Sequence, residues 1–176
     1  MAAKSILAIL IGATSLSGCM AANQLPTERL ASATLTLSNG APAGTAQLVA
    51  AGQQLSLAVA ITGISEGAHG LHLHTTGSCV RPDFTSAGGH LNPTNKDHGK
   101  LSPNGSHVGD MPNLEVGNSR TASATIDLAG ERSEIMAWLF DADGIAVVVH
   151  AGADDYRTDP SGDAGSRIAC GVLKKL

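Results

Sequence analysis

The sequence contains few aromatic side chains, no excess of positive charge and few cysteines. Aromatic residues make up 2% of the 176 residues, so a hydrophobic core must be built from Leu, Ile, Val and Ala. The formal net charge is −4, so the chain lacks the basic surface that binds nucleic acid. What the sequence has instead is 21 glycines, which predict many turns within one domain of ordinary size.

An apolar run long enough to cross a membrane is also missing. The longest run, over residues 5–17, has about 13 residues, whereas roughly 20 are needed to span a bilayer. Its length suits the core of a signal peptide, preceded by the positive charge of Lys4. Leu16-Ser17-Gly18-Cys19 resembles the lipobox of bacterial lipoproteins, in which the cysteine is lipidated and becomes the mature N-terminus.

We therefore expect a signal peptide over residues 1–18, then a lipidated Cys19 and a polar tether over residues 19–32, and an exported domain over residues 33–176. The expected location is the periplasm or cell envelope, with the lipid on Cys19 anchoring the protein to a membrane. An ordinary cleaved signal peptide, with Cys19 incidental, is the alternative.

The chain has three cysteines, and an even pair is left if Cys19 carries lipid. An exported protein folds in an oxidising compartment, so Cys79 and Cys170 are expected to form a disulfide. The bond would close a loop of about 90 residues, for which the loop-entropy treatment gives roughly 4 to 5 kcal/mol.

Short alternating runs of apolar residues dominate the rest of the chain, and no long helical period interrupts them. Apolar residues alternate over 55–61 and over 121–128, and residues 145–149 form a short β-branched run. Asn39-Gly40 is a typical turn. Many short strands with glycine-rich turns indicate an all-β sandwich or barrel. Two long irregular stretches, residues 75–118 and 151–166, are expected to be functional loops.

Histidines form two groups that suggest metal binding. His72 and His74 are two apart on a predicted strand, so both side chains project from one face. His150 ends another predicted strand and could complete the same site. A site of imidazoles with an open position suits copper in a redox role.

The second group lies on the first long loop. His90, His98, His107 and Asp110 supply three nitrogens and one carboxylate. That donor set is typical of a closed, four-coordinate structural zinc site. A single histidine is usually a hydrogen-bonded or solvated residue, but six of the seven in this pattern indicate two metal sites.

These segments together resemble the copper/zinc superoxide dismutase family. Gly67 to His74 (GAHGLHLH) is similar to the family's Gly-x-His-Gly-x-His-x-His signature. Segments 86–93, 97–99 and 107–110 resemble the family's zinc loop, and 165–172 resembles its C-terminal signature. The resemblance runs in order from about residue 33 to 172. Segments 79–84 and 154–156 bring it closest to the bacterial exported, lipoprotein-type branch.

The resemblance implies a Greek-key β-sandwich or flattened barrel of immunoglobulin-like type, with the two long loops carrying the site. It implies copper ligands His72, His74, His90 and His150, and zinc ligands His90, His98, His107 and Asp110. It also implies that the remaining histidine, His69, is structural and that Cys79 and Cys170 form the family disulfide.

The implied reaction is the dismutation of superoxide to dioxygen and hydrogen peroxide, as an antioxidant defence in the cell envelope. Copper would cycle between Cu(II) and Cu(I), while zinc would be structural. His90 would bridge the metals and carry a proton, and Arg167 would dock the anion. Asp154 would link His72 to His98 and so orient both ligands.

Some positions depart from the family pattern without removing a ligand. Leu71 stands where an aromatic residue is usual, Thr75 replaces a frequent acidic residue, and 159–163 is a short substitute for the charged loop of animal members. Two other classes remain open: a metal-storage protein without turnover, and an adhesion or structural module on the same fold. The sequence is compatible with a monomer or a homodimer.

Overall fold

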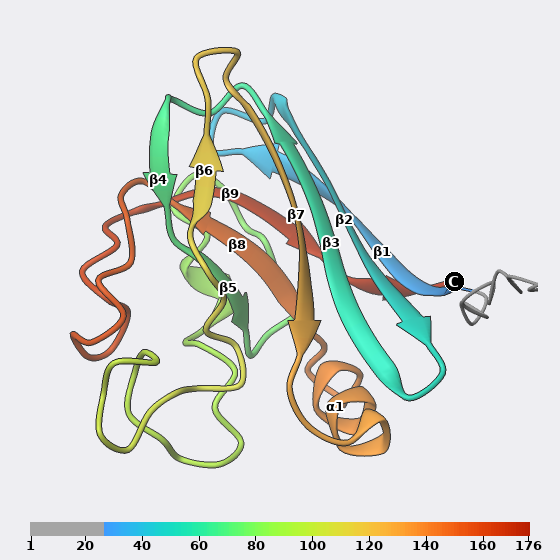
Figure 1. The fold of residues 1–176 in the computed structure, drawn as a ribbon. Coiled ribbons are helices and arrows are strands. Elements are labelled where there is room, and N and C mark those ends of the chain that lie inside the picture. Colours follow the sequence, from blue (N-terminus) through green and yellow to red (C-terminus); the bar gives the residue numbers. More distant parts are fainter. Residues whose placement is uncertain (1–26) are drawn as a thin grey trace, which may run out of the picture.

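The computed structural model describes residues 27–176, which form a curved antiparallel sheet with two long loops on one side (Figure 1). The strands are β1 Thr27–Leu37, β2 Pro42–Ala51, β3 Gln54–Thr62, β4 Gly67–His69, β5 Leu71–His74, β6 Leu114–Val116, β7 Thr121–Leu128, β8 Ala146–His150, β9 Arg167–Val172 and β10 Lys174–Lys175. One helix, α1 Arg132–Leu139, and one 3-10 turn, η1 Thr85–Ala87, complete the elements of these residues.

The strand order makes the sheet a Greek-key half-barrel, so the expected all-β fold is confirmed. The main sheet has the order β5–β8–β9–β1–β2–β3–β7, with β10 beside β1, while β4 and β6 pair separately. Strand β9, near the end of the chain, thus lies between β8 and the first strand, β1. Pairings between the named strands are antiparallel.

In the long strand β3, every second side chain is buried, which explains why this segment forms a strand. Leu55, Leu57, Val59 and Ile61 of β3 are buried, as their alternation predicts. The predicted strand at 121–128 is β7, which pairs with β3 along its length. The turn at Asn39-Gly40 joins β1 to β2, with Gly40 at a φ of 88° that favours glycine. The buried residues of the main core are aliphatic apart from Met111, as the scarcity of aromatic residues requires.

The disulfide predicted between Cys79 and Cys170 is present, with 5.7 Å between the two Cα atoms. Cys170 lies on β9, and Cys79 lies at the start of the first long loop. The bond therefore ties this loop to the sheet. The 3-10 turn η1 packs there as well, because Phe84 and Ala87 are buried against Val148 of β8.

Two features differ from the expectation. Strand β1 begins at Thr27, so residues 27–32 form part of the sheet instead of the tether: Glu28 pairs with Ala50 of β2, and Ala31 is fully buried. Helix α1 was not predicted, because its 8 residues are too few to show a helical period. It packs through Ile135 and Leu139.

The expected signal peptide, residues 1–18, and the expected lipidation site, Cys19, lie outside the described residues. Within residues 27–176, no helix is long and apolar enough to cross a membrane.

Candidate metal centre

Strands β5 and β8 bring the first group of histidines together. His72 pairs with Val148 across the two strands, so His150 at the end of β8 comes beside the start of β5. An isolated bridge between His74 and His90 places the loop histidine next to this strand. The ligand atoms of His72, His74, His90 and His150 lie within 4.8 Å of one another, and all four side chains are buried.

The second group gathers around one carboxylate oxygen. The Nδ1 atoms of His90, His98 and His107 lie 2.9, 3.1 and 3.0 Å from Oδ1 of Asp110. The other oxygen, Oδ2, accepts hydrogen bonds from the main-chain N–H of Gly99 at 2.8 Å and of His107 at 3.0 Å. Asp110 therefore holds the loop in shape and offers one oxygen to the same point as the three imidazoles.

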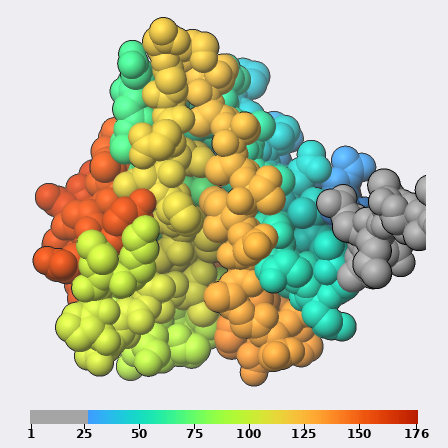
Figure 2. Space-filling model, viewed as in Figure 1, coloured from blue at the N-terminus to red at the C-terminus, as the bar shows by residue number. Residues whose placement is uncertain are grey.

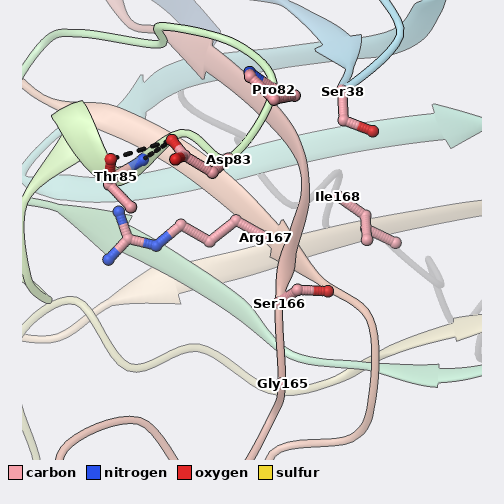
Figure 3. A pocket seen from close by; sticks show the side chains of 8 residues that line it. All are labelled: Ser38, Pro82, Asp83, Thr85, Gly165, Ser166, Arg167 and Ile168. Carbon is pink, nitrogen blue, oxygen red and sulfur yellow. Dashed lines mark hydrogen bonds between the residues drawn. The ribbon is translucent and has the colours of Figure 1, made fainter.

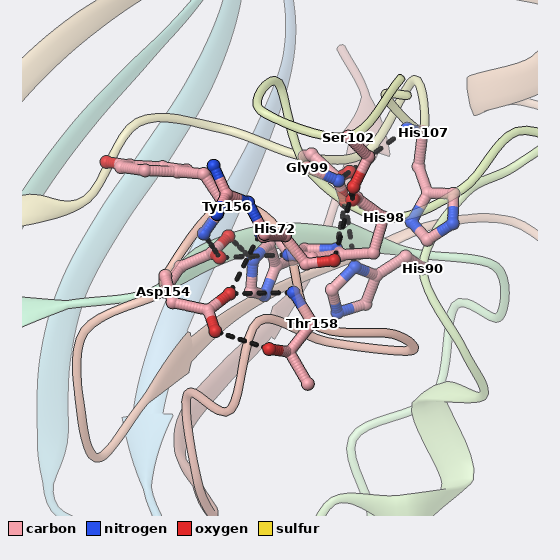
Figure 4. Close-up of polar contacts among 12 residues, drawn as sticks. His72, His90, His98, Gly99, Ser102, His107, Asp154, Tyr156 and Thr158 are labelled. Carbon is pink, nitrogen blue, oxygen red and sulfur yellow. Dashed lines mark hydrogen bonds and ion pairs between the residues drawn. The ribbon is translucent and has the colours of Figure 1, made fainter. Parts of the chain in front are cut away.

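Asp154 connects the two groups. Its Oδ2 lies 2.8 Å from Nε2 of His72, and its Oδ1 lies 2.9 Å from Nε2 of His98 (Figure 4). Gly162 packs over this contact so closely that a Cβ there would collide with the carboxylate. The link expected between His72 and His98 is thus present in the structure.

Five imidazoles direct one nitrogen to an oxygen and leave the other, which is buried, without a hydrogen bond. The Nδ1–H of His74 donates to the carbonyl of Gly88 at 2.9 Å, and that of His150 donates to Gly165 at 3.0 Å. The buried nitrogens without a hydrogen bond are Nδ1 of His72, Nε2 of His74, Nε2 of His90, Nδ1 of His98 and Nε2 of His150. Four of these nitrogens belong to the first group and one, Nδ1 of His98, to the second. Buried polar atoms are rarely left unpaired, so these nitrogens fit a metal ion at each group.

Burial keeps three histidines of the first group, His74, His90 and His150, uncharged. Desolvation lowers the pKa of His74 to about 2 and the pKa of His90 and His150 to about 4. Neutral imidazole is the form that binds a metal, so protons compete weakly for these rings near neutral pH.

The pKa values of Asp110 and Asp154 are also lowered, but for a carboxylate this favours the charged form. Although burial alone would raise the pKa of Asp110, hydrogen bonds from His90 and the N–H of Gly99 hold that pKa well below its usual range. For Asp154, burial is likewise outweighed by hydrogen bonds from His72 and His98, and the pKa falls to about 2. Both carboxylates are therefore ionised, as ligands and their supports must be.

His69 lies outside both groups, and both of its ring nitrogens lie near main-chain carbonyls. Its Nδ1 is 2.8 Å from the main-chain carbonyl of His150, and its Nε2 is 3.1 Å from that of Ser65. The ring thereby joins β4 to the end of β8.

Arg167 lies next to the first group. Its Nη1 donates to the carbonyl of Phe84 and its Nη2 to the carbonyl of Gly88, each at 2.7 Å. Because Gly88 also accepts the Nδ1–H of His74, the guanidinium and this imidazole share one acceptor. Strand pairing explains the position: Arg167 of β9 lies opposite His150 of β8.

Sequence reasoning missed Asn113, which clamps the main chain of Asp154. The side-chain Nδ2 of Asn113 donates to the carbonyl of Asp154 at 3.0 Å, and Oδ1 accepts from its N–H at 2.9 Å. The main-chain N–H of Asn113 donates to the hydroxyl of Tyr156 at 2.8 Å. An asparagine in a loop carries no signal of such a role, because the partner groups are main-chain atoms 41 residues away.

The two long loops lie side by side over the site, as Figure 2 shows for the residues near 100 and near 155. The N–H of His98 donates to Oδ1 of Asp159, and the N–H of Leu101 donates to the carbonyl of Tyr156. The loop that supplies the second group is therefore fastened to the loop that supplies Asp154.

Comparison with known proteins identifies relatives of one family. A family model described as copper/zinc superoxide dismutase matches residues 42–173. A superoxide dismutase-like protein of Bacillus subtilis, YojM, is 47% identical over 110 residues, which cover 59% of this chain and 54% of the relative. Copper/zinc superoxide dismutase 2 of Aquifex aeolicus is 39% identical over 148 residues, which cover 82% of this chain and 86% of the relative.

The matched segment thus spans about half the length of the Bacillus relative but most of the Aquifex one. Among solved structures, the crystal structure of a superoxide dismutase-like protein from Bacillus subtilis matches with a TM-score of 0.75 and 37% identity. That match covers 81% of this chain and 97% of the other. The two histidine groups match the copper and zinc sites of the family.

Proposed function

This chain belongs to the copper/zinc superoxide dismutase family, and we propose that it converts superoxide to dioxygen and hydrogen peroxide. One observation carries the proposal: four buried imidazole nitrogens without hydrogen-bond partners converge on the first group, and one of those rings, His90, also directs its Nδ1 to the Asp110 oxygen around which the second group gathers. A ring shared by both groups places a protonatable nitrogen beside the redox site, which suits coupled electron and proton transfer and which a storage protein does not need.

We assign the residues of the two sites as follows. Copper would be held by His72, His74, His90 and His150, and zinc by His90, His98, His107 and Asp110. Copper, when bound, supplies reversible one-electron transfer, and zinc supplies a fixed positive charge without redox chemistry.

The side chains around the sites have distinct tasks. Arg167 attracts the anion and holds it near His74, with which it shares the carbonyl of Gly88. His90 can hold a proton at Nε2 and pass it to the peroxide product, while its Nδ1 stays with the zinc group. Asp154 keeps the protons of His72 and His98 on their Nε2 atoms, so that both Nδ1 lone pairs remain free.

The overall reaction consumes two superoxide anions and two protons. The first superoxide loses an electron and leaves as dioxygen. The second gains that electron and takes up both protons to leave as hydrogen peroxide.

The direct test is removal of superoxide by purified protein loaded with copper and zinc. We expect rapid loss of superoxide, abolished when chelators strip the protein and restored when both metals return. Stoichiometric copper binding without faster superoxide loss would instead favour the metal-storage alternative.

We also propose that the mature protein is held in the cell envelope through lipid on Cys19. The support is sequence alone: the apolar run over residues 5–17 and the lipobox-like Leu16-Ser17-Gly18-Cys19. The described domain begins to form strand at Thr27, so the spacer after Cys19 would be shorter than expected.

A further inference from the structure

A cavity of about 490 Å³ opens beside Arg167 (Figure 3). Its lining includes Gly165, whose carbonyl accepts the Nδ1–H of His150. It also includes Arg167, which shares the carbonyl of Gly88 with His74. Two histidines of the first group, His74 and His150, thus contact a lining residue of the cavity or share an acceptor with one. An anion at Arg167 in the cavity would therefore lie near both rings.

A negative charge is built into the same wall. The Oδ1 of Asp83 accepts hydrogen bonds from the N–H of Thr85 at 3.0 Å and from its hydroxyl at 2.9 Å. In Figure 3, Asp83, Thr85 and the guanidinium of Arg167 gather at one end of the cavity, away from Ser38 and Ile168. Asp83 thus makes its hydrogen bonds to Thr85 and leaves its carboxylate exposed in the space where an anion meets Arg167.

This carboxylate stays ionised. The hydrogen bonds from Thr85, first from its N–H and then from its hydroxyl, lower the pKa of Asp83 below its usual range, and the charge of Arg167 adds to the effect. The neighbouring Arg81 places its guanidinium against Gly40 at the β1–β2 turn. Asp83 and Arg167 are therefore the two charged side chains that line this cavity.

We propose that Asp83 is a counter-charge that limits the attraction of small anions to Arg167 and so tunes access of the anionic substrate to the copper group. The inference rests on the proposed function. An incoming anion experiences the sum of both charges, and such local fields set association rates of charged ligands. The hydrogen bonds to Thr85 also shape the turn before η1, and an asparagine oxygen could accept the same two bonds, although more weakly.

The first test compares Asp83→Asn with Glu134→Gln in protein loaded with both metals. Each substitution removes one negative charge, but Glu134 is exposed on α1 and does not line the cavity. At low ionic strength we expect Asp83→Asn to raise the second-order rate of superoxide removal about two- to threefold over Glu134→Gln. The gain should vanish at high salt, because ions screen the exposed carboxylate. Equal rates in the two variants at low salt would overturn the proposal.

The second test does not depend on turnover. Azide, a small anion, is titrated into each copper-loaded variant while the visible absorption of copper reports binding. We expect a lower azide Kd for Asp83→Asn than for Glu134→Gln at low salt, and equal values would overturn the proposal. If no variant removes superoxide but azide still binds Asp83→Asn more tightly, the proposed function fails while the role of Asp83 stands.

Discussion

At the scale of single residues, the site depends on which atom carries each imidazole proton. The carbonyl of Gly88 accepts the Nδ1–H of His74, and that of Gly165 accepts the Nδ1–H of His150. The Nε2 atom of each ring therefore carries the lone pair that is free to bind a metal. For His72 the carboxylate of Asp154 reverses this choice and leaves Nδ1 free. The donor atoms are thus selected by neighbouring oxygens, and these neighbours matter as much as the histidines themselves.

We predict that His150→Ala will separate the copper function from the fold. The variant loses one imidazole of the copper group, but the main-chain N–H of His150 still donates to Gly70 at 2.8 Å. Superoxide removal should fall by at least about 100-fold, since even indirect damage to a ligand costs 10- to 100-fold. Circular dichroism and zinc content should stay near wild type. Full activity in this variant would contradict the copper assignment.

Asn113→Ala should weaken both metals although Asn113 is a ligand of neither. The substitution removes two hydrogen bonds to the main chain of Asp154, which holds His72 and His98. We expect copper and zinc affinities to fall about 10- to 100-fold, as for other groups that support ligands. Chelator competition measures both affinities.

Asn113→Asp is the matched control for that clamp. An aspartate keeps an oxygen for the N–H of Asp154 but cannot donate to its carbonyl, and it places a second negative charge near Asp154. Its affinities should lie below wild type, because the donated bond is lost. Wild-type affinities in both variants would show that the clamp has no bearing on the metals.

At the scale of elements, strand β9 builds the site together with β5 and β8. Arg167 begins β9 and Cys170 lies within it, so one strand positions both the proposed anion-binding group and the disulfide to the long loop. β9 occupies this place because it enters between β8 and β1. The strand order, and not sequence proximity, brings Arg167 opposite His150.

The zinc loop is the element whose stability should depend on metal. Asp110→Ala removes one ligand together with the acceptor for the N–H groups of Gly99 and His107. The variant should lose zinc, and its Tm should fall by about 5–10 °C. The estimate follows from roughly 2.7 kcal/mol of stabilisation at a metal concentration 100-fold above Kd, at about 2–4 °C per kcal/mol.

Asp110→Asn separates the two effects of that substitution. Its amide oxygen can still accept from the loop N–H groups, but the side chain is a much poorer zinc ligand. Calorimetry with and without added zinc should therefore show no zinc-dependent rise in Tm for either variant, and a higher Tm for Asn than for Ala. An unchanged Tm with zinc still bound to Asp110→Ala would refute a structural zinc at this place.

At the scale of the whole molecule, the proposed membrane anchor can be removed without touching the folded domain. Acylation requires the thiol of Cys19, so Cys19→Ser should move the protein from the membrane fraction to the soluble envelope fraction or leave it unprocessed. Activity and the Cys79–Cys170 disulfide should persist, because the substitution changes neither of these cysteines and none of the metal-group residues.

Cell fractionation with mass spectrometry of the N-terminus makes this measurement. Acyl chains anchor by burying CH₂ groups at roughly 0.8 kcal/mol each, so more than one chain is needed for stable attachment. A wild-type protein that is already soluble and carries no acyl mass would identify residues 1–18 as an ordinary signal peptide.

Much of the architecture was predictable because local patterns and burial agree. The alternation at Leu55, Leu57, Val59 and Ile61 predicted β3, and residues 121–128 predicted β7, since one face of β3 is buried and one face of β7 is at least half-buried. Helix α1 and the early start of β1 at Thr27 were not predictable in the same way. A two-turn helix shows too little period, and the first residues of β1 are held by pairing with β2.

The sequence by itself determined which chemistry the protein can perform. Metal ligands must be particular side chains, so the residue types and their spacing were enough to indicate the histidines and Asp110 as ligands and the cysteine pair as a disulfide. Only the tertiary structure decided which groups orient those ligands: Asn113, the carbonyls of Gly88 and Gly165, and the charge of Asp83 beside Arg167. Every residue has the same main-chain carbonyl, and an exposed carboxylate is common in loops. Their roles therefore arise from where the folded chain places them.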